Sequence, residues 1–209
     1  MIFDPATLPE SRSYRLMISA FVPRPIAFVS TRGPAGVDNC APFSFSMGVS
    51  SAPMVLAVSV GSRDGAPKDT ARNILDTREF VVNLVTEAIA EKMNVASGDY
   101  APEVSEFEEA GLTRAPCEVV NAPRIAESPV GFECRLLQHV VVAGNTVFFG
   151  EVVRLHVDDR VMSDGLVDAR KLRAIGRLGA GQYCRTTDVF EMKRPKVSGP
   201  KAARPTEAR

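Results

Sequence analysis

Residues 61–73, GSRDGAPKDTARN, contain the residue types that bind anions. Up to Thr70 the segment holds two cations, Arg63 and Lys68, in a loop with Gly and Ser. Asp69 and Thr70 follow, and either side chain can cap the start of a helix. A helix N-terminus offers unpaired N–H donors and a positive partial charge. With two cations beside it, this segment is a candidate monophosphate site.

The segment does not match a Walker-type phosphate loop, which needs Gly directly before Lys and then Ser or Thr. Here Ala66 and Pro67 precede Lys68, and Asp69 follows it. A solvated turn with an ordinary helix cap is the alternative interpretation, and the residues of this loop alone leave both open.

Residues 30–46 place small polar groups beside the end of an expected strand. The side chains able to hydrogen-bond a heteroaromatic ring edge or a sugar are Ser30, Thr31, Asn39, Ser44 and Ser46. Pro42 and Phe43 supply an apolar wall. The alternative is a long loop whose hydroxyl groups satisfy only its own backbone.

The glycines of residues 176–181, GRLGAG, do not match the G-x-G-x-x-G fingerprint or stand at a strand-to-helix junction, so a Rossmann site is not supported. Tyr183, just beyond them, is a candidate for stacking on a ligand. The alternative interpretation is that Tyr183 packs in the core or at an interface.

Histidine and cysteine are too few and too scattered for a metal centre or a dithiol motif. The two histidines, His139 and His156, are expected to face solvent on strands. The cysteines lack C-x-x-C spacing and are expected to be buried reduced thiols: Cys40, Cys117, Cys134 and Cys184. We therefore predict no metal site.

Short segments rich in Val, Ile and Phe predict strands at residues 26–31, 54–60 and 79–85. Two longer strands, at 132–142 and 146–158, form an expected hairpin with its turn at Gly144-Asn145. In the second of these, Val153, Leu155 and Val157 alternate with polar residues and are expected to pack on a core.

Helical signals are short. They occur from Asp69 or Thr70 through Leu75, at residues 86–96, and from Ser105, which forms a possible capping box with Glu108, to a stop at Gly111. Hairpins with short interspersed helices favour an antiparallel barrel or sandwich over a doubly wound parallel sheet.

The composition is that of one globular domain. The chain has 209 residues, 45% hydrophobic and 24% charged, with 25 cationic and 25 acidic side chains. A net charge of +0 gives no global field for nucleic acid or an anionic membrane. No signal pattern or long apolar run is present, so a cytoplasmic location is expected. Residues 1–194 form the expected domain and 195–209, rich in proline, an expected mobile tail.

Several motifs stand in the order that one known family has. They are PRPIAFVST at 23–31, Asn39 with APFSF at 41–45, KDT with Asn73 at 68–73, EFVVN at 79–83 and RLGAGQY at 177–183. Together they resemble the flavin reductase-like family from about residue 14 to residue 195. The resemblance implies the FMN-binding split β-barrel: a mainly β, Greek-key antiparallel barrel with short peripheral helices.

The resemblance also implies non-covalent FMN. By position, Ser30 and Thr31 would approach the isoalloxazine ring. Its edge would be lined, largely through backbone groups, by Asn39, Ala41, Pro42, Phe43 and Ser44. The residues implied around the ribityl phosphate are Ser62, Arg63, Lys68, Asp69 and Thr70. We add Tyr183 to the expected cofactor-binding residues.

The hypothesis that follows is an NAD(P)H-dependent flavin reductase, in which hydride passes to flavin N5 and the reduced flavin serves another acceptor, such as a partner monooxygenase. The cofactor carries this chemistry, so no catalytic side chain is expected. A homodimer is implied. Family members often carry a His in the C-terminal glycine-rich motif, whereas residues 177–183 contain none, and NADH is not separated from NADPH. The alternatives are a flavoredoxin-like electron carrier without a nicotinamide site, and a binding protein with an empty pocket.

Overall fold

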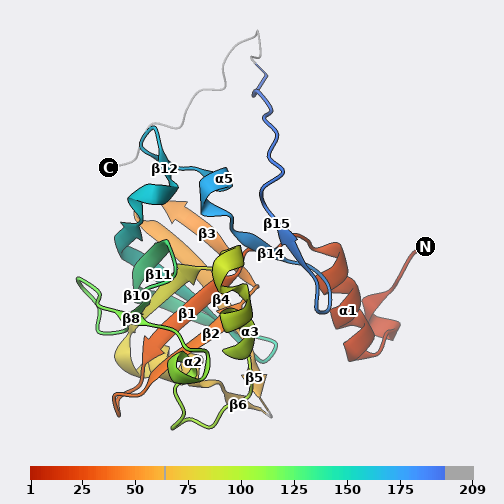
Figure 1. Ribbon diagram of the computed structural model, residues 1–209. Coiled ribbons are helices and arrows are strands. Elements are labelled where there is room, and N and C mark those ends of the chain that lie inside the picture. The colour runs from red at the N-terminus through yellow and green to blue at the C-terminus, as the bar shows by residue number, and fades with distance from the viewer. Residues whose placement is uncertain (64, 196–209) are drawn as a thin grey trace, which may run out of the picture.

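A seven-stranded antiparallel sheet forms the centre of the structure (Figure 1). This computed structural model describes residues 1–63 and 65–195. The strand order is β2-β1-β7-β10-β11-β4-β3. The strands are β1 (Ala27–Arg32), β2 (Asp38–Phe43), β3 (Ser46–Ser51), β4 (Met54–Val60), β7 (Glu79–Leu84), β10 (Val130–Val142) and β11 (Asn145–Val157). The expected tail lies, apart from residue 195, outside the described residues.

The sheet is an open barrel whose two edge strands are neighbours in the chain. β2 and β3 stand at opposite ends of the strand order, and only Ser44 and Phe45 separate them. β2 pairs with β1 and β3 pairs with β4, and within the described residues no ladder joins β2 to β3. The expected mainly β, antiparallel barrel is confirmed.

Strand β1 is buried on both faces and separates two apolar cores. Val29 points into one core with Phe148 of β11. Phe28 points into the other with Met93 and Phe107, which lie on helices at the outside of the sheet. Side chains of a strand alternate between faces, so this double coverage explains why β1 is almost wholly apolar or small.

The helices are peripheral (Figure 1). They are α1 (Glu10–Ala20), α2 (Asp69–Thr77), α3 (Ala90–Val95), α4 (Glu106–Glu109) and α5 (Ala169–Leu172), with 3₁₀ turns at Pro5–Thr7, Glu87–Ile89 and Asp159–Val161. The minor hairpins are β5 (Ser62–Arg63) with β6 (Ala66–Pro67), β8 (Arg114–Ala115) with β9 (Arg124–Ile125), β12 (Met162–Ser163) with β13 (Leu166–Val167), and β14 (Ile175–Arg177) with β15 (Tyr183–Arg185).

The long hairpin differs from its prediction in two respects. Its turn is formed by Ala143 and Gly144, with φ of 45° and 84°, so it begins one residue earlier than expected. Leu155 is 46% exposed, because the end of β11 extends beyond the core. His139 is exposed as expected, whereas His156 is half-buried and contacts the buried Glu133 carboxylate.

The predicted helix caps are also corrected. Lys68 is the N-cap of α2, and neither Asp69 nor Thr70 caps it, because both stand inside the first turn. Ser105 is the N-cap of α4 but makes no side-chain cap; its hydroxyl donates instead to the Asp38 carbonyl at 2.6 Å. The expected capping box with Glu108 is therefore not formed.

Arg24 joins the N-terminal helix to the rest of the protein. It is 3% exposed, and its guanidinium donates to the carbonyls of Ile18 and Phe21 at 2.5 and 2.8 Å. It also donates to the Leu178 carbonyl at 2.9 Å and to Ser44 Oγ at 3.3 Å. The end of α1, the β14–β15 hairpin and the β2–β3 junction are thereby fixed beside one another.

The Asn39 side chain joins its own strand, β2, to three further elements. Its Oδ1 accepts hydrogen bonds from Thr70 of α2 at 2.9 Å and Thr31 of β1 at 3.3 Å. Its Nδ2 donates to Glu106 Oε1 of α4 at 2.7 Å. Glu106 Oε2 in turn accepts the Cys40 N–H at 3.2 Å. All of these groups are buried, so one amide fixes α2 and α4 against the edge strand β2.

We predict that Asn39→Ala lowers the free energy of unfolding by about 2–4 kcal/mol, because it leaves buried groups of Glu106, Thr31 and Thr70 without partners. Urea unfolding at neutral pH measures this. Asn121→Ala is the control, since Asn121 is exposed and its loss should cost less than about 0.5 kcal/mol. Equal stability of the two variants would show that the amide does not join these elements.

Candidate functional site

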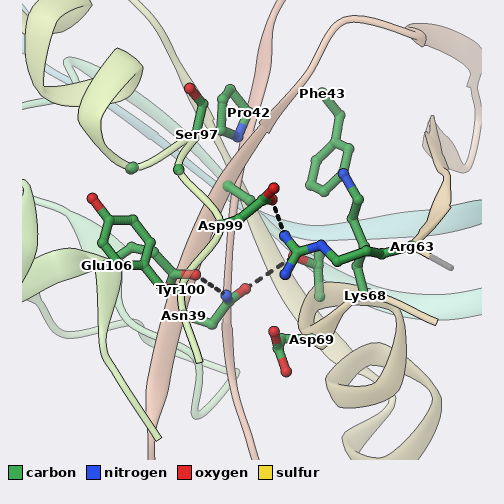
Figure 2. Close-up of a pocket in the computed structure, with 14 residues that line it drawn as sticks. Asn39, Pro42, Phe43, Arg63, Lys68, Asp69, Ser97, Asp99, Tyr100 and Glu106 are labelled. Atoms are coloured by element: carbon green, nitrogen blue, oxygen red, sulfur yellow. Dashed lines mark hydrogen bonds and ion pairs between the residues drawn. The ribbon is translucent and has the colours of Figure 1, made fainter. Parts of the chain in front are cut away.

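The start of α2, the strand β2 and residues 96–100 line a pocket, which we call the first pocket (Figure 2). Strand β2 contributes Asn39, Ala41, Pro42 and Phe43. Across from it lie Arg63 and residues 68–70, and the remaining wall consists of residues 96–100 and Glu106.

Arg63 and Lys68 give the first pocket its positive charge. The Arg63 side chain is 40% exposed and forms an ion pair with Asp99. Lys68 is half-buried at the N-cap of α2, where no side chain of residues 1–63 or 65–195 accepts from the N–H groups of the first turn. Unpaired N–H groups beside two cations attract an anion.

Three carboxylates also line this pocket. Asp69 is paired with Arg72 one turn further along α2. Asp99 is paired with Arg63. Glu106 is 6% exposed, and burial raises its pKa above the ordinary value, an effect that the hydrogen bonds from Cys40 and Asn39 oppose.

A second pocket adjoins the first. The two pockets share Pro42 and Ser97, so together they form one groove along β2. The other residues of the second pocket are Tyr14, Ile18, Arg24, Ile26, Ser44, Met93, Asn94, Arg177 and Tyr183. This end of the groove combines apolar and aromatic groups with two guanidinium groups.

Tyr183 and Arg177 are held against each other at the end of the second pocket. The Arg177 guanidinium lies 4.5 Å from the centre of the Tyr183 ring and contacts the Tyr183 hydroxyl. Arg177 also donates to the Ala180 carbonyl at 2.5 Å. Both side chains come from the β14–β15 hairpin, which Arg24 fixes in place. The ring is thereby held rigidly on the pocket wall.

The wall shared by the two pockets is an edge of the sheet. The Cys40 N–H points away from β1, because it donates to Glu106, and Pro42 stands two residues further on the same side. A proline is tolerated there because no ladder bond needs its missing N–H. On this side Ala41 and Pro42 of β2 line the groove, whereas the Cys40 N–H is bonded to Glu106.

Most of the predicted site residues meet in this groove. The first pocket contains Asn39, Ala41, Pro42, Phe43, Arg63, Lys68, Asp69 and Thr70, and the second contains Ser44 and Tyr183. The Asn39 amide oxygen is used within the protein, so this side chain mainly positions other groups. Ser62 is exposed and lines neither pocket, because it stands on the outer hairpin β5–β6.

Ser30 and Thr31 do not reach the groove. Both are 0% exposed. The Ser30 hydroxyl donates to the Pro123 carbonyl at 2.6 Å and accepts from Asn83 at 3.0 Å. Thr31 donates to Asn39 and accepts from Asn73 at 3.0 Å. Their hydroxyl groups connect β1 to its neighbours instead of lining the groove, and the contact with a ring that the resemblance implies for them stays a prediction.

The sequence did not indicate several residues of the groove. Residues 97–100 follow α3 and have the sequence SGDY, in which Ser, Gly and Asp are typical of a turn. This turn signal could have identified them. Glu106 stands near Glu108 and Glu109 in α4, and nothing in the sequence distinguishes the one that turns inward. Arg24 and Tyr14 lie far from the other motifs along the chain.

Within residues 1–63 and 65–195, no group of three or more His, Cys, Asp and Glu side chains is arranged to hold a metal ion. The helices of the same part of the chain are not long and apolar enough to cross a membrane.

Comparison with known sequences identifies the family. The flavin reductase like domain matches residues 18–176. An uncharacterized protein of Halalkalibacterium halodurans is 42% identical over 205 residues, which cover 95% of this chain and 98% of that protein.

Two solved structures are similar over almost their whole length. Nitrilotriacetate monooxygenase component B from Bacillus cereus is 31% identical, with a TM-score of 0.90 over 92% of this chain and 98% of that one. The 2-nitrobenzoate 2-nitroreductase of Pseudomonas fluorescens is 29% identical, with a TM-score of 0.87 over 97% and 100% of the two chains.

A structure from Shewanella frigidimarina with a split barrel domain has a TM-score of 0.80 at 24% identity, over 95% of this chain and 100% of that one. This similarity shows the fold of the chain. Flavoredoxin of Desulfovibrio vulgaris has a TM-score of 0.71 at 25% identity, over 84% and 92% of the two chains. The expected split barrel is confirmed, and the chain belongs to the flavin reductase-like family.

Proposed function

We propose that this protein is a flavoprotein oxidoreductase that binds FMN along the groove, with the phosphate in the first pocket and the isoalloxazine ring in the second. The groove itself carries the proposal. One end has Arg63, Lys68 and a helix N-terminus, and the other has an aromatic wall that includes Tyr183. FMN matches these two ends, since it has a phosphate anion at one end and a planar aromatic ring at the other.

Each part of the groove has a defined role in this proposal. Arg63, Lys68 and the first N–H groups of α2 would hold the phosphate. The backbone of β2 beside Pro42 would hydrogen-bond the ring edge. Tyr183 and Met93 would cover the ring and exclude water. Bound FMN supplies the redox chemistry, so the protein needs only to hold and shield it.

We further propose NADH or NADPH as the electron donor, and a separate protein or small molecule as the acceptor. The proposal of this donor is supported by the family, and by a further open hollow on the surface that Tyr183 lines together with residues 87–92. A partner monooxygenase is one acceptor class, which the similarity to a monooxygenase component B supports. Location in the cytoplasm stays a prediction.

One observation favours the alternative of an electron carrier without a nicotinamide site. Residues 177–183 contain no histidine, and the groups of Arg177 and Tyr183 that face the second pocket are engaged with each other. The similarity to flavoredoxin agrees with this alternative. Electron transfer from nicotinamide distinguishes the two functions.

A homodimer also belongs to the proposal. Apolar side chains are exposed on β3, where Met47 is 61% and Val49 46% exposed, and on α1, where Met17 is 49% exposed. Val141, at the tip of the long hairpin, is 69% exposed. A second copy would cover this apolar surface.

We predict that Lys68→Ala weakens FMN binding by roughly one to two orders of magnitude, because a charge-assisted hydrogen bond is worth about 1.5–3 kcal/mol. Riboflavin, which lacks the phosphate, should bind the variant and the parent almost equally. Fluorescence titration with both ligands measures this.

Lys171→Ala, on the exposed α5, is the control for the loss of one positive charge and should bind FMN as the parent does. If Lys68→Ala weakens FMN and riboflavin equally, the loss is a folding defect. If it weakens neither, the phosphate assignment fails.

The FMN-loaded protein should lose its yellow absorption when NADH or NADPH is added without oxygen. Spectra recorded over time measure the reduction, and the faster nucleotide identifies the donor. Chemical reduction by dithionite is the control that the flavin is reducible. Bleaching by dithionite but by neither nucleotide would support the electron carrier instead.

Light scattering at micromolar concentration should give about twice the chain mass of 22.5 kDa. Met47→Glu should shift the mass toward one chain, because it places a charge in the apolar surface. A parent protein with the mass of one chain would contradict the dimer.

A further inference from the structure

The first pocket contains more negative than positive charge among its described residues. Its cations are Arg63 and Lys68, and its acids are Asp69, Asp99 and Glu106. An anion that enters such a pocket is repelled as well as attracted. The position and partners of each acid therefore decide how tightly a phosphate is held.

Two of the acids are engaged away from an incoming ligand. Asp69 pairs with Arg72, which lies one turn further along α2. Glu106 is buried and accepts from Asn39 and from the Cys40 N–H. Neither carboxylate contacts Arg63 or Lys68 among the interactions of the described residues.

Asp99 differs, because it contacts one of the two phosphate-binding cations. Figure 2 shows its carboxylate pointing from residues 97–100 across the pocket at the Arg63 guanidinium. The Asp99 side chain is 78% exposed, so it is free to move between Arg63 and solvent.

The segment that carries Asp99 is fixed in place. The Tyr100 hydroxyl donates to the Val95 carbonyl at 3.1 Å, and its ring lies on Gly98, where a Cβ would come within 2.9 Å of the ring. Ser97 Oγ donates to the Asn94 carbonyl at 2.6 Å. The backbone therefore presents the Asp99 side chain to the pocket.

We propose that Asp99 competes with the flavin phosphate for Arg63 and so limits the affinity for FMN. The carboxylate must leave the guanidinium before the phosphate takes its place, which slows association and weakens binding. The flavin then exchanges with solution, as suits a protein that delivers reduced flavin to a separate acceptor. This inference rests on the proposed function, since it assigns the exchange property of the same site.

Removal of the competing charge tests the proposal. Asp99→Asn should tighten FMN binding about two- to fivefold at low ionic strength, the range of an exposed ion pair, mainly through faster association. The gain should shrink at high salt. Riboflavin affinity should not change. Fluorescence titration and stopped-flow association measure these effects.

Two further variants make the result specific. Asp76→Asn removes the same charge from the exposed side of α2 and should leave FMN affinity unchanged. In an Arg63→Ala background, Asp99→Asn should change FMN affinity less than twofold, because the group that is competed for is absent. A gain retained in that background would mean general repulsion and would overturn the proposal.

If the parent binds FMN and Asp99→Asn binds it equally or more weakly, Asp99 does not compete with the phosphate. The proposed function is then unaffected. A parent that binds neither FMN nor riboflavin overturns the proposed function, and this inference fails with it.

Discussion

The structure of the groove depends on one buried amide. Asn39 accepts from Thr31 and Thr70 and donates to Glu106, which places β1, β2, α2 and α4 around a single side chain. Buried polar groups are costly without partners, so these elements have few other ways to pack. The start of α2 is therefore held beside the edge of β2. The end of the groove that we propose holds the phosphate lies at this junction.

A second fixed point determines the other end. Arg24 is buried, and its guanidinium donates hydrogen bonds to carbonyls at the end of α1 and in the turn of the β14–β15 hairpin. Tyr183 is thereby brought to the wall opposite Ser44, although the two are far apart in sequence. These two polar anchors position the two ends of the groove, and the apolar core that contains Phe28 also supports the second pocket, because Ile26 and Met93 belong to that core and Tyr183 packs against it.

Strands were predictable where both faces are apolar, as in β1 and β4, because burial on both sides selects Val, Ile and Phe. β2 was not predicted as a strand, since its polar residues and Pro42 suggest irregular structure; an edge strand tolerates both. That Arg63 and Lys68 line one pocket was predictable because they are close in the chain. The inward turn of Glu106 was not, because only its tertiary contact with Asn39 selects it.

The central claim is that one ligand lies along the whole groove, with its anionic end at α2 and its ring at the β14–β15 hairpin. A crystal structure of the protein with FMN tests this most directly. The account predicts the phosphate between Arg63 and Lys68, and the isoalloxazine ring against β2 beside Tyr183. A phosphate bound away from the start of α2, or a ring outside the second pocket, would contradict it.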